Sequence, residues 1–263
     1  MIESEATGGP EIDEEICVCV DVFPPVDDDL ARSGAAQGER AESLDSVYAE
    51  DPGNPARIAV LKGKRWAPGQ TLRIAFMGGE REVQRRVREV AELWTRHANL
   101  TFDFDDGPSA QIRIAFTRGE GSWSYIGRDC LSIRRDEPTM NLGWLTRSTP
   151  DEECSRVVLH EFGHALGCIH EHQNPDAGIP WDTEAVYKYY MGPPNRWKRA
   201  DVDSNLFQRY ARNVTQFSRF DPRSIMLYAI PKAHTLDRKA RPGNSTLSET
   251  DIDFIQRMYP RAS

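Results

Sequence analysis

The chain has 263 residues, 28% of them charged, and a formal net charge of −8, which suits one large folded domain or two small ones. No apolar stretch reaches the roughly 18 residues that a membrane span requires. No block of Lys and Arg indicates nucleic-acid binding either. We therefore expect a globular protein whose partners include neither a membrane nor a nucleic acid.

The charge is unevenly distributed. Residues 1–55 contain fifteen acidic residues and two arginines, a net −13, whereas the rest of the chain carries +5. This acidic segment shows no helical or strand periodicity, which predicts disorder. It also lacks the basic start and apolar run of a secretory signal. We expect a folded domain over residues 56–263, in a protein that is cytoplasmic or is exported by a route that this chain does not encode.

Five cysteines are an odd number, so they cannot all be paired with one another. They are Cys17, Cys19, Cys130, Cys154 and Cys168. Cys154 and Cys168 are expected on one helix, about 20 Å apart, which is too far for a disulfide. A bond between Cys130 and Cys154 and a set of free thiols in a reducing compartment are both compatible with the sequence.

The first elements of the domain are strands with one helix among them. Alternating apolar residues predict a strand over 71–77, and from Glu80 an apolar face recurs with helical spacing. The members of that face are Val83, Val87, Val90 and Trp94. Further strands are predicted over 100–104, 111–116, 122–127 and 139–145. The run DFDDG (103–107) offers carboxylates that suit calcium, although a β-turn is the competing interpretation.

A longer helix begins near residue 150. Thr149 is the expected N-cap, Pro150 the first helical residue, and Glu152 completes a capping box. Apolar residues cover so much of the surface of this helix that it should be buried.

Two more helices follow. One begins after Asp182 and stops at Gly192, and the last has Ser248 as its cap with Asp251 at the third position. Strands with one helix among them, followed by helices alone, predict an α+β domain.

The run HEFGHALGCIHEH, which begins at residue 160, contains four of the six histidines. His160 and His164 are four residues apart, so their rings lie on one helix face and can reach one zinc ion. Gly167 can adopt a left-handed conformation that ends the helix and brings His170 round as a third ligand. Three nitrogens and an open fourth position are typical of a catalytic zinc. The alternative, histidines that satisfy hydrogen bonds in a core, does not explain the whole pattern.

Residues 160–170 match H-E-x-x-H-x-x-G-x-x-H, and the sequence therefore resembles the metzincin zinc endopeptidases. Within SIMLY (224–228), Met226 corresponds to the methionine of their turn beneath the zinc. HEHQNPD and SWSYIG are similar to segments of the astacins, and Tyr228 falls where astacins have a tyrosine that can bind or approach zinc. The resemblance implies a twisted mixed sheet with an active-site helix in the N-terminal lobe. It also implies a mainly helical or irregular C-terminal lobe.

Some positions differ from the astacin pattern. Leu227 stands where astacins usually have histidine, and Ser122 where they have a disulfide cysteine. The closing segment LSETDIDFIQRMYP is more similar to the last helix of the matrixins. The resemblance is thus to an astacin/matrixin-like protease.

This resemblance implies a monomeric zinc endopeptidase that hydrolyses internal peptide bonds by attack of a zinc-bound water. Glu161 would be the general base, and the Tyr228 hydroxyl would stabilise the oxyanion. The substrate would lie extended along the edge strand near 122–127. The metal ligands would be His160, His164 and His170. A zinc-stabilised binding module without turnover is the rival, and an intact Glu161 argues against it.

Two further expectations concern residues near this motif. Cys17 or Cys19 could occupy the fourth zinc position, so that the acidic segment would be an inhibitory propeptide, although a disordered segment with ordinary thiols is the competing interpretation. His172 is expected to be exposed to solvent beside the site, with no role as a ligand.

Overall fold

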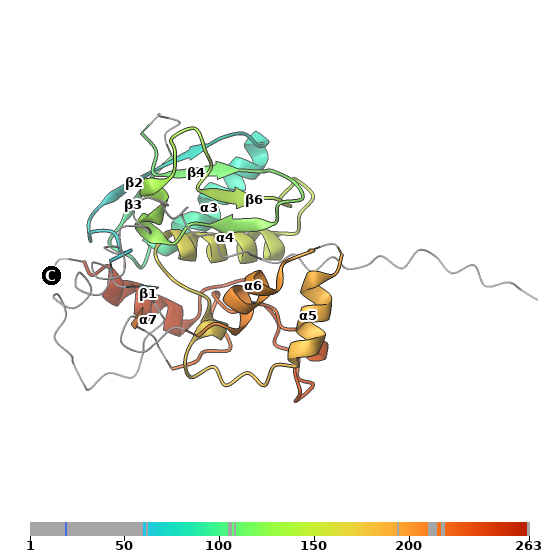
Figure 1. Cartoon of the computed structure of the whole chain (residues 1–263). Helices are drawn as coiled ribbons and strands as arrows, with labels where there is room; N and C mark the ends of the chain where they lie inside the picture. The colour runs from blue at the N-terminus through green and yellow to red at the C-terminus, as the bar shows by residue number, and fades with distance from the viewer. Residues whose placement is uncertain are drawn as a thin grey trace, which may run out of the picture.

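The computed structural model describes residues 19, 60–61, 63–104, 107, 109–193, 195–209, 215–216 and 219–261. The described strands are β1 (Val60–Leu61), β2 (Thr71–Phe76), β3 (Thr101–Asp103), β4 (Ile112–Ala115), β5 (Ser122–Ser124), β6 (Met140–Leu142) and β7 (Thr215–Gln216). The described α-helices are α3 (Arg81–Thr95), α4 (Asp151–Ala165), α5 (Thr183–Met191), α6 (Arg199–Val202) and α7 (Glu249–Met258). The sheet and α3 form an upper lobe, α5, α6 and α7 belong to a lower one, and α4 runs between them (Figure 1). All five segments predicted as strands contain a strand.

The main sheet has the order β3-β2-β4-β6-β5. The first four strands are parallel, and β5 pairs antiparallel with β6 at the edge of the sheet. Because β2 lies between β3 and β4, the consecutive predicted strands 100–104 and 111–116 are not neighbours. Parallel strands need a crossover connection, and α3 supplies the one between β2 and β3. Asp105 and Asp106, on which the calcium hypothesis depends, lie outside the described residues.

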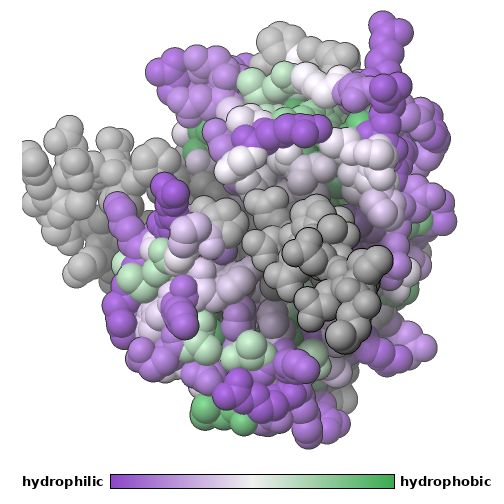
Figure 2. All heavy atoms as spheres, turned by 90° about the vertical axis from the view of Figure 1, so that its right-hand side faces the viewer, coloured by the Kyte–Doolittle hydropathy of each residue, from purple (hydrophilic) through white to green (hydrophobic). Residues whose placement is uncertain are grey.

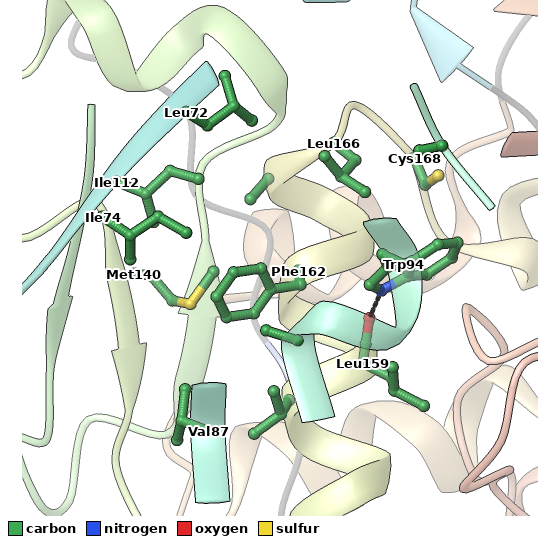
Figure 3. Packing of buried hydrophobic residues seen from close by; sticks show 14 of the residues in the cluster. Leu72, Ile74, Val87, Trp94, Ile112, Met140, Leu159, Phe162, Leu166 and Cys168 are labelled. Carbon is green, nitrogen blue, oxygen red and sulfur yellow. Dashed lines mark hydrogen bonds between the residues drawn. The ribbon is translucent and has the colours of Figure 1, made fainter. Parts of the chain in front are cut away.

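The main core lies between the sheet and the two helices α3 and α4. Leu72 and Ile74 alternate with more exposed residues along β2, and both side chains lie on the side of the strand that faces α4 (Figure 3). The indole N–H of Trp94 donates a hydrogen bond to the carbonyl oxygen of Leu159 at 3.0 Å, which ties α3 to α4. The predicted apolar face of α3 is confirmed, because three of its four members are buried and Val90 is partly buried.

The helix α4 is buried over its last two turns and more, from Val157 to Ala165. One side packs on the main core, and His160 contacts the carbonyl oxygen of Ile225, in the segment that follows the lower-lobe helices α5 and α6. A second cluster of buried residues forms that lobe: Cys19, Ile179, Val186, Tyr190, Val202, Leu206, Leu227, Tyr228 and Ile230. The prediction from its broad apolar face, that this helix is buried, is confirmed.

The predicted capping box of this helix is wrong. Pro150 is the N-cap, and no side chain caps the helix. The Thr149 hydroxyl instead accepts a hydrogen bond from the backbone N–H of Thr146 at 2.9 Å, within the preceding turn. Asp151, Glu152 and Glu153 in the first turn interact favourably with the helix dipole.

The other two predicted caps are confirmed. The Asp182 side chain accepts a hydrogen bond from the N–H of Ala185 at the start of α5. Ser248 and Asp251 form a reciprocal capping box at the start of α7. The C-cap of α5 is Gly192, as expected.

Cys130, Cys154 and Cys168 are buried free thiols, so the predicted alternative of a Cys130–Cys154 bond does not occur. Cys168 also lies beyond the end of α4 rather than on it. Burial raises the pKa of the Cys130 thiol to about 12, which keeps it protonated at neutral pH.

Hydrophilic side chains predominate on the face of the molecule in Figure 2, and apolar ones form small separate areas there. Among the described residues, the exposed large apolar side chains come from four separate segments: Met77, Leu131, Met191 and Leu236. Within the part of the chain that was searched, no helix is long and apolar enough to cross a membrane.

Candidate metal centre

Three imidazole rings converge at the C-terminal end of α4. The Nε2 atoms of His160, His164 and His170 lie 3.0, 3.1 and 3.2 Å from one another. Three nitrogens around a tetrahedral zinc at about 2.05 Å would be roughly 3.3 Å apart. The spacing therefore fits one zinc ion.

The local backbone explains how the third histidine arrives. Gly167 has a φ of 100°, and its N–H donates to the carbonyl oxygen of His164, so the helix ends there and the chain reverses toward His170. The predicted left-handed glycine is thus confirmed. Within the motif, a Cβ on Gly163 would lie 2.3 Å from the sulfur of Met226. The absence of a side chain at residue 163 lets Met226 pack directly beneath the motif.

Backbone carbonyls fix the orientation of two of the rings. His160 Nδ1 is 2.8 Å from the carbonyl oxygen of Ile225, and His164 Nδ1 is 2.9 Å from that of Cys168. A carbonyl only accepts, so each Nδ1 carries the proton and each Nε2 keeps its lone pair for a metal. Asp251 supports this arrangement by accepting a hydrogen bond from the N–H of Ile225 at 2.9 Å.

The charge state of the rings also suits a metal. Burial, together with the neighbouring histidines, holds the pKa of His160 and of His170 well below the ordinary value. Both rings are therefore neutral at physiological pH, which is the form that binds zinc. The donor set and its protonation fit the ion that the motif implies.

Glu161 and Tyr228, the two residues predicted to be catalytic, lie beside the three histidines. Glu161 is 1% exposed, and Tyr228 is 7% exposed with its ring centroid 4.2 Å from that of His170. A hollow at this point is bounded by both residues and also by Trp144, Arg156 and Tyr190. The five residues predicted as the site are thus brought together.

The structure adds a residue from the acidic N-terminal segment. Cys19 is buried, and its Sγ and the three histidine nitrogens form a group in which all atoms lie within 4.8 Å of one another. The thiol donates a hydrogen bond to Oε2 of Glu161 at 3.3 Å. The carbonyl oxygen of Cys19 accepts a hydrogen bond from the Tyr228 hydroxyl. Cys17, the other thiol of the hypothesis, lies outside the described residues.

The expectation that His172 is exposed is wrong, because its side chain is 1% exposed. The ring of His172 contacts the carbonyl oxygen of Asn205 and the ring of Trp181, which come from later segments of the chain. Sequence reasoning also missed the second role of Asp251. Its place in a capping box was visible, whereas its bond to Ile225 depends on how α7 packs.

The fold and the three-histidine site are those of a metzincin-type zinc protease domain. The model of the peptidase family described as Astacin matches residues 60–260. The chain therefore belongs to the astacin family. The predictions of an astacin-like metzincin, an α+β protease domain, an enzyme and a zinc cofactor are confirmed.

Individual relatives agree with this membership. Zinc metalloproteinase dpy-31 of Teladorsagia circumcincta is 28% identical over 206 residues, which are 74% of this chain and 31% of that protein. The Caenorhabditis elegans protein of the same name is 28% identical over 74% of this chain and 32% of its own length. The chain thus spans about a third of the length of these relatives.

Two solved structures of myroilysin are more similar. One has a TM-score of 0.75 and 47% identity, and the alignment covers 78% of this chain and 100% of the myroilysin chain. The other has a TM-score of 0.66 and 38% identity, and the alignment covers 98% of this chain and 99% of the myroilysin chain.

Proposed function

We propose that this chain hydrolyses internal peptide bonds of protein substrates, with Glu161 as the general base. The observation that supports it most is the meeting of three buried histidines and a buried carboxylate in one small volume. Zinc, when bound by the three Nε2 atoms, would act as a Lewis acid on the substrate carbonyl and lower the pKa of water.

The chain's own residues would move the protons. Glu161 would accept a proton from the attacking water and return it to the leaving amine. The Tyr228 hydroxyl would donate a hydrogen bond to the oxygen of the scissile carbonyl as its charge develops. Tyr228 already donates to a carbonyl oxygen, that of Cys19, which supports this role.

The edge strand β5 suits an extended substrate. It ends the main sheet, and its outer side makes an isolated bridge between Ser122 and Cys19. An extended peptide can add a strand to such an edge through main-chain hydrogen bonds. Because an open edge does not require a chain terminus, we propose cleavage within chains.

The first prediction concerns the metal. Full-length protein that carries Cys19→Ser, so that the neighbouring thiol does not block the site, should cleave unfolded casein, lose this activity with an excess of chelator and regain it when zinc is added back. The chelator removes the ion that the three histidines hold, so activity and bound zinc should fall together. Fragments would be identified by mass spectrometry and zinc by atomic absorption. If this variant were folded and loaded with zinc but left casein intact, the result would favour the binding module.

We further propose that residues 1–55 are a propeptide that keeps the enzyme latent through Cys19. A thiolate is a strong zinc ligand, and Cys19 Sγ lies where it would complete a four-coordinate site with the histidines. Such a site has no position left for water. The same residue contacts Glu161, Tyr228 and the edge strand, so it competes with water, with the oxyanion and with substrate.

The second prediction follows from this competition. Cys19→Ser in the full-length chain should raise the initial rate on a peptide substrate by about tenfold or more, because a tethered inhibitory ligand acts at a high effective concentration. Cys17→Ser is the matched control, since it removes a thiol two residues away, and it should leave the rate unchanged.

Two outcomes would contradict the proposals, one the latency and the other the protease activity. If wild type, Cys19→Ser and Cys17→Ser were equally active, the chain would be a protease without this form of latency. If all three bound zinc and none cleaved the peptide, the proposed activity itself would be wrong.

A further inference from the structure

His172 is the member of the histidine run that the zinc site does not use. Its ring is stacked on Tyr228, with centroids 4.6 Å apart and planes inclined by 24°. Its other neighbour in the stack is His170, at 5.1 Å and 27°. Trp181 meets its edge at 6.2 Å and 87°. His172 therefore lies against both a zinc ligand and the tyrosine beside the site.

A hydrogen bond fixes the plane of this ring. Nε2 of His172 donates to the carbonyl oxygen of Asn205 at 2.8 Å. Asn205 belongs to η3 (Asp203–Phe207), a single turn of π-helix in which the N–H of Gln208 reaches back five residues to the carbonyl oxygen of Asp203. Single π-turns are frequent at functional sites. This one offers a backbone acceptor to His172 beneath the metal centre.

In this arrangement His172 is not one of the metal-centre residues. The nitrogen that donates to Asn205 carries a proton, and His172 is not among the residues whose donor atoms gather at the metal centre. Its buried imidazole stacks on Tyr228 and donates a hydrogen bond to the backbone of Asn205. It can therefore restrict the rotamers of Tyr228.

We infer that His172 is a positioning residue for Tyr228: it holds the phenol ring so that its hydroxyl faces the oxygen of the scissile carbonyl. This inference rests on the proposed oxyanion role of Tyr228. The stack limits the ring from one side, and the π-turn η3 prevents the imidazole from rotating away. Because the hydroxyl matters mainly in the transition state, the loss of this support should lower kcat more than it changes KM.

A double-mutant cycle on kcat tests the inference. All variants are made in full-length chains that carry Cys19→Ser, so that inhibition by the thiol does not hide an effect on kcat. They are His172→Ala, Tyr228→Phe and the double variant. We expect His172→Ala to lower kcat about 10- to 100-fold, the range found when outer-shell partners are removed. In the Tyr228→Phe background the same change should lower kcat less than about threefold, because the hydroxyl is already gone.

Two further variants separate positioning from support of the fold. Gln173→Ala is the matched control: Gln173 Nε2 also donates to η3, at 3.1 Å to the carbonyl oxygen of Ser204, but its side chain makes no stack with Tyr228. It should leave kcat within about threefold of its parent. His172→Phe keeps a ring in the stack and should recover most of the kcat that His172→Ala loses.

The outcomes are distinguishable. Equal losses of kcat from His172→Ala in both backgrounds would overturn the inference, as would an equal loss from Gln173→Ala. A fall in zinc affinity, measured by chelator competition, would assign His172 to the support of His170 instead. If Tyr228→Phe left kcat unchanged while Glu161→Gln abolished it, the oxyanion role would fail while the proposed protease activity stood.

Discussion

Replacing Glu161 by glutamine should leave the fold and zinc content intact and lower kcat about 10²–10⁴-fold, the usual contribution of a general base. Glutamine has nearly the same shape as glutamate, but its amide cannot accept a proton from water. The glutamate is not among the three nitrogen ligands, so its loss should not release the metal. The measurement is kcat on a peptide substrate, with zinc content determined on the same sample.

The background matters for this experiment, because the Cys19 thiol donates to the carboxylate of Glu161. The comparison is therefore made twice, in chains with Cys19 intact and with Cys19→Ser. Asp253→Asn is a suitable control, because Asp253 is an exposed carboxylate of α7 that pairs with Arg257 and is not among the residues gathered at the metal centre. A glutamine variant with stoichiometric zinc and activity within tenfold of its parent would show that another group is the base.

Replacing Tyr228 by phenylalanine should lower kcat about 10²–10³-fold with little change in KM, as for the removal of one oxyanion donor. Only the hydroxyl is lost. The ring contacts with His170 and His172 can remain, so the effect is assigned to a hydrogen bond and not to packing. The measurement is a full kinetic analysis of the Cys19→Ser chain with and without the change.

Tyr228→Phe also tests whether the N-terminal segment is held at the site through Cys19. In the chain with Cys19 intact, Tyr228→Phe removes the hydrogen bond to the Cys19 carbonyl and should weaken the hold on the N-terminal segment. The segment should then be cut more readily by a second protease. An increase in KM alone, at unchanged kcat, would instead make Tyr228 a substrate-binding residue.

The sequence by itself determined the candidate zinc site and the elements that carry it. His160, Glu161 and His164 lie on one helix, and Gly167 turns the chain so that His170 follows within three residues. These relations are local, so helix geometry and the conformational freedom of glycine are enough to predict them. The caps Asp182 and Ser248 and the apolar face of α3 were predictable for the same reason. At the start of α4 a local turn competed for the Thr149 hydroxyl, and the capping prediction failed there.

Tertiary structure alone decided which distant groups surround that site. Cys19 and Glu161 are 142 positions apart in the chain, and spacing cannot show whether Cys17 or Cys19 would approach it. The same is true of His172: its neighbours in sequence suggest an exposed turn, whereas the lower lobe supplies the backbone acceptor and the aromatic rings that bury it. A polar side chain can be buried only where partners satisfy its hydrogen bonds. Those partners come from segments that meet only when the two lobes pack on α4.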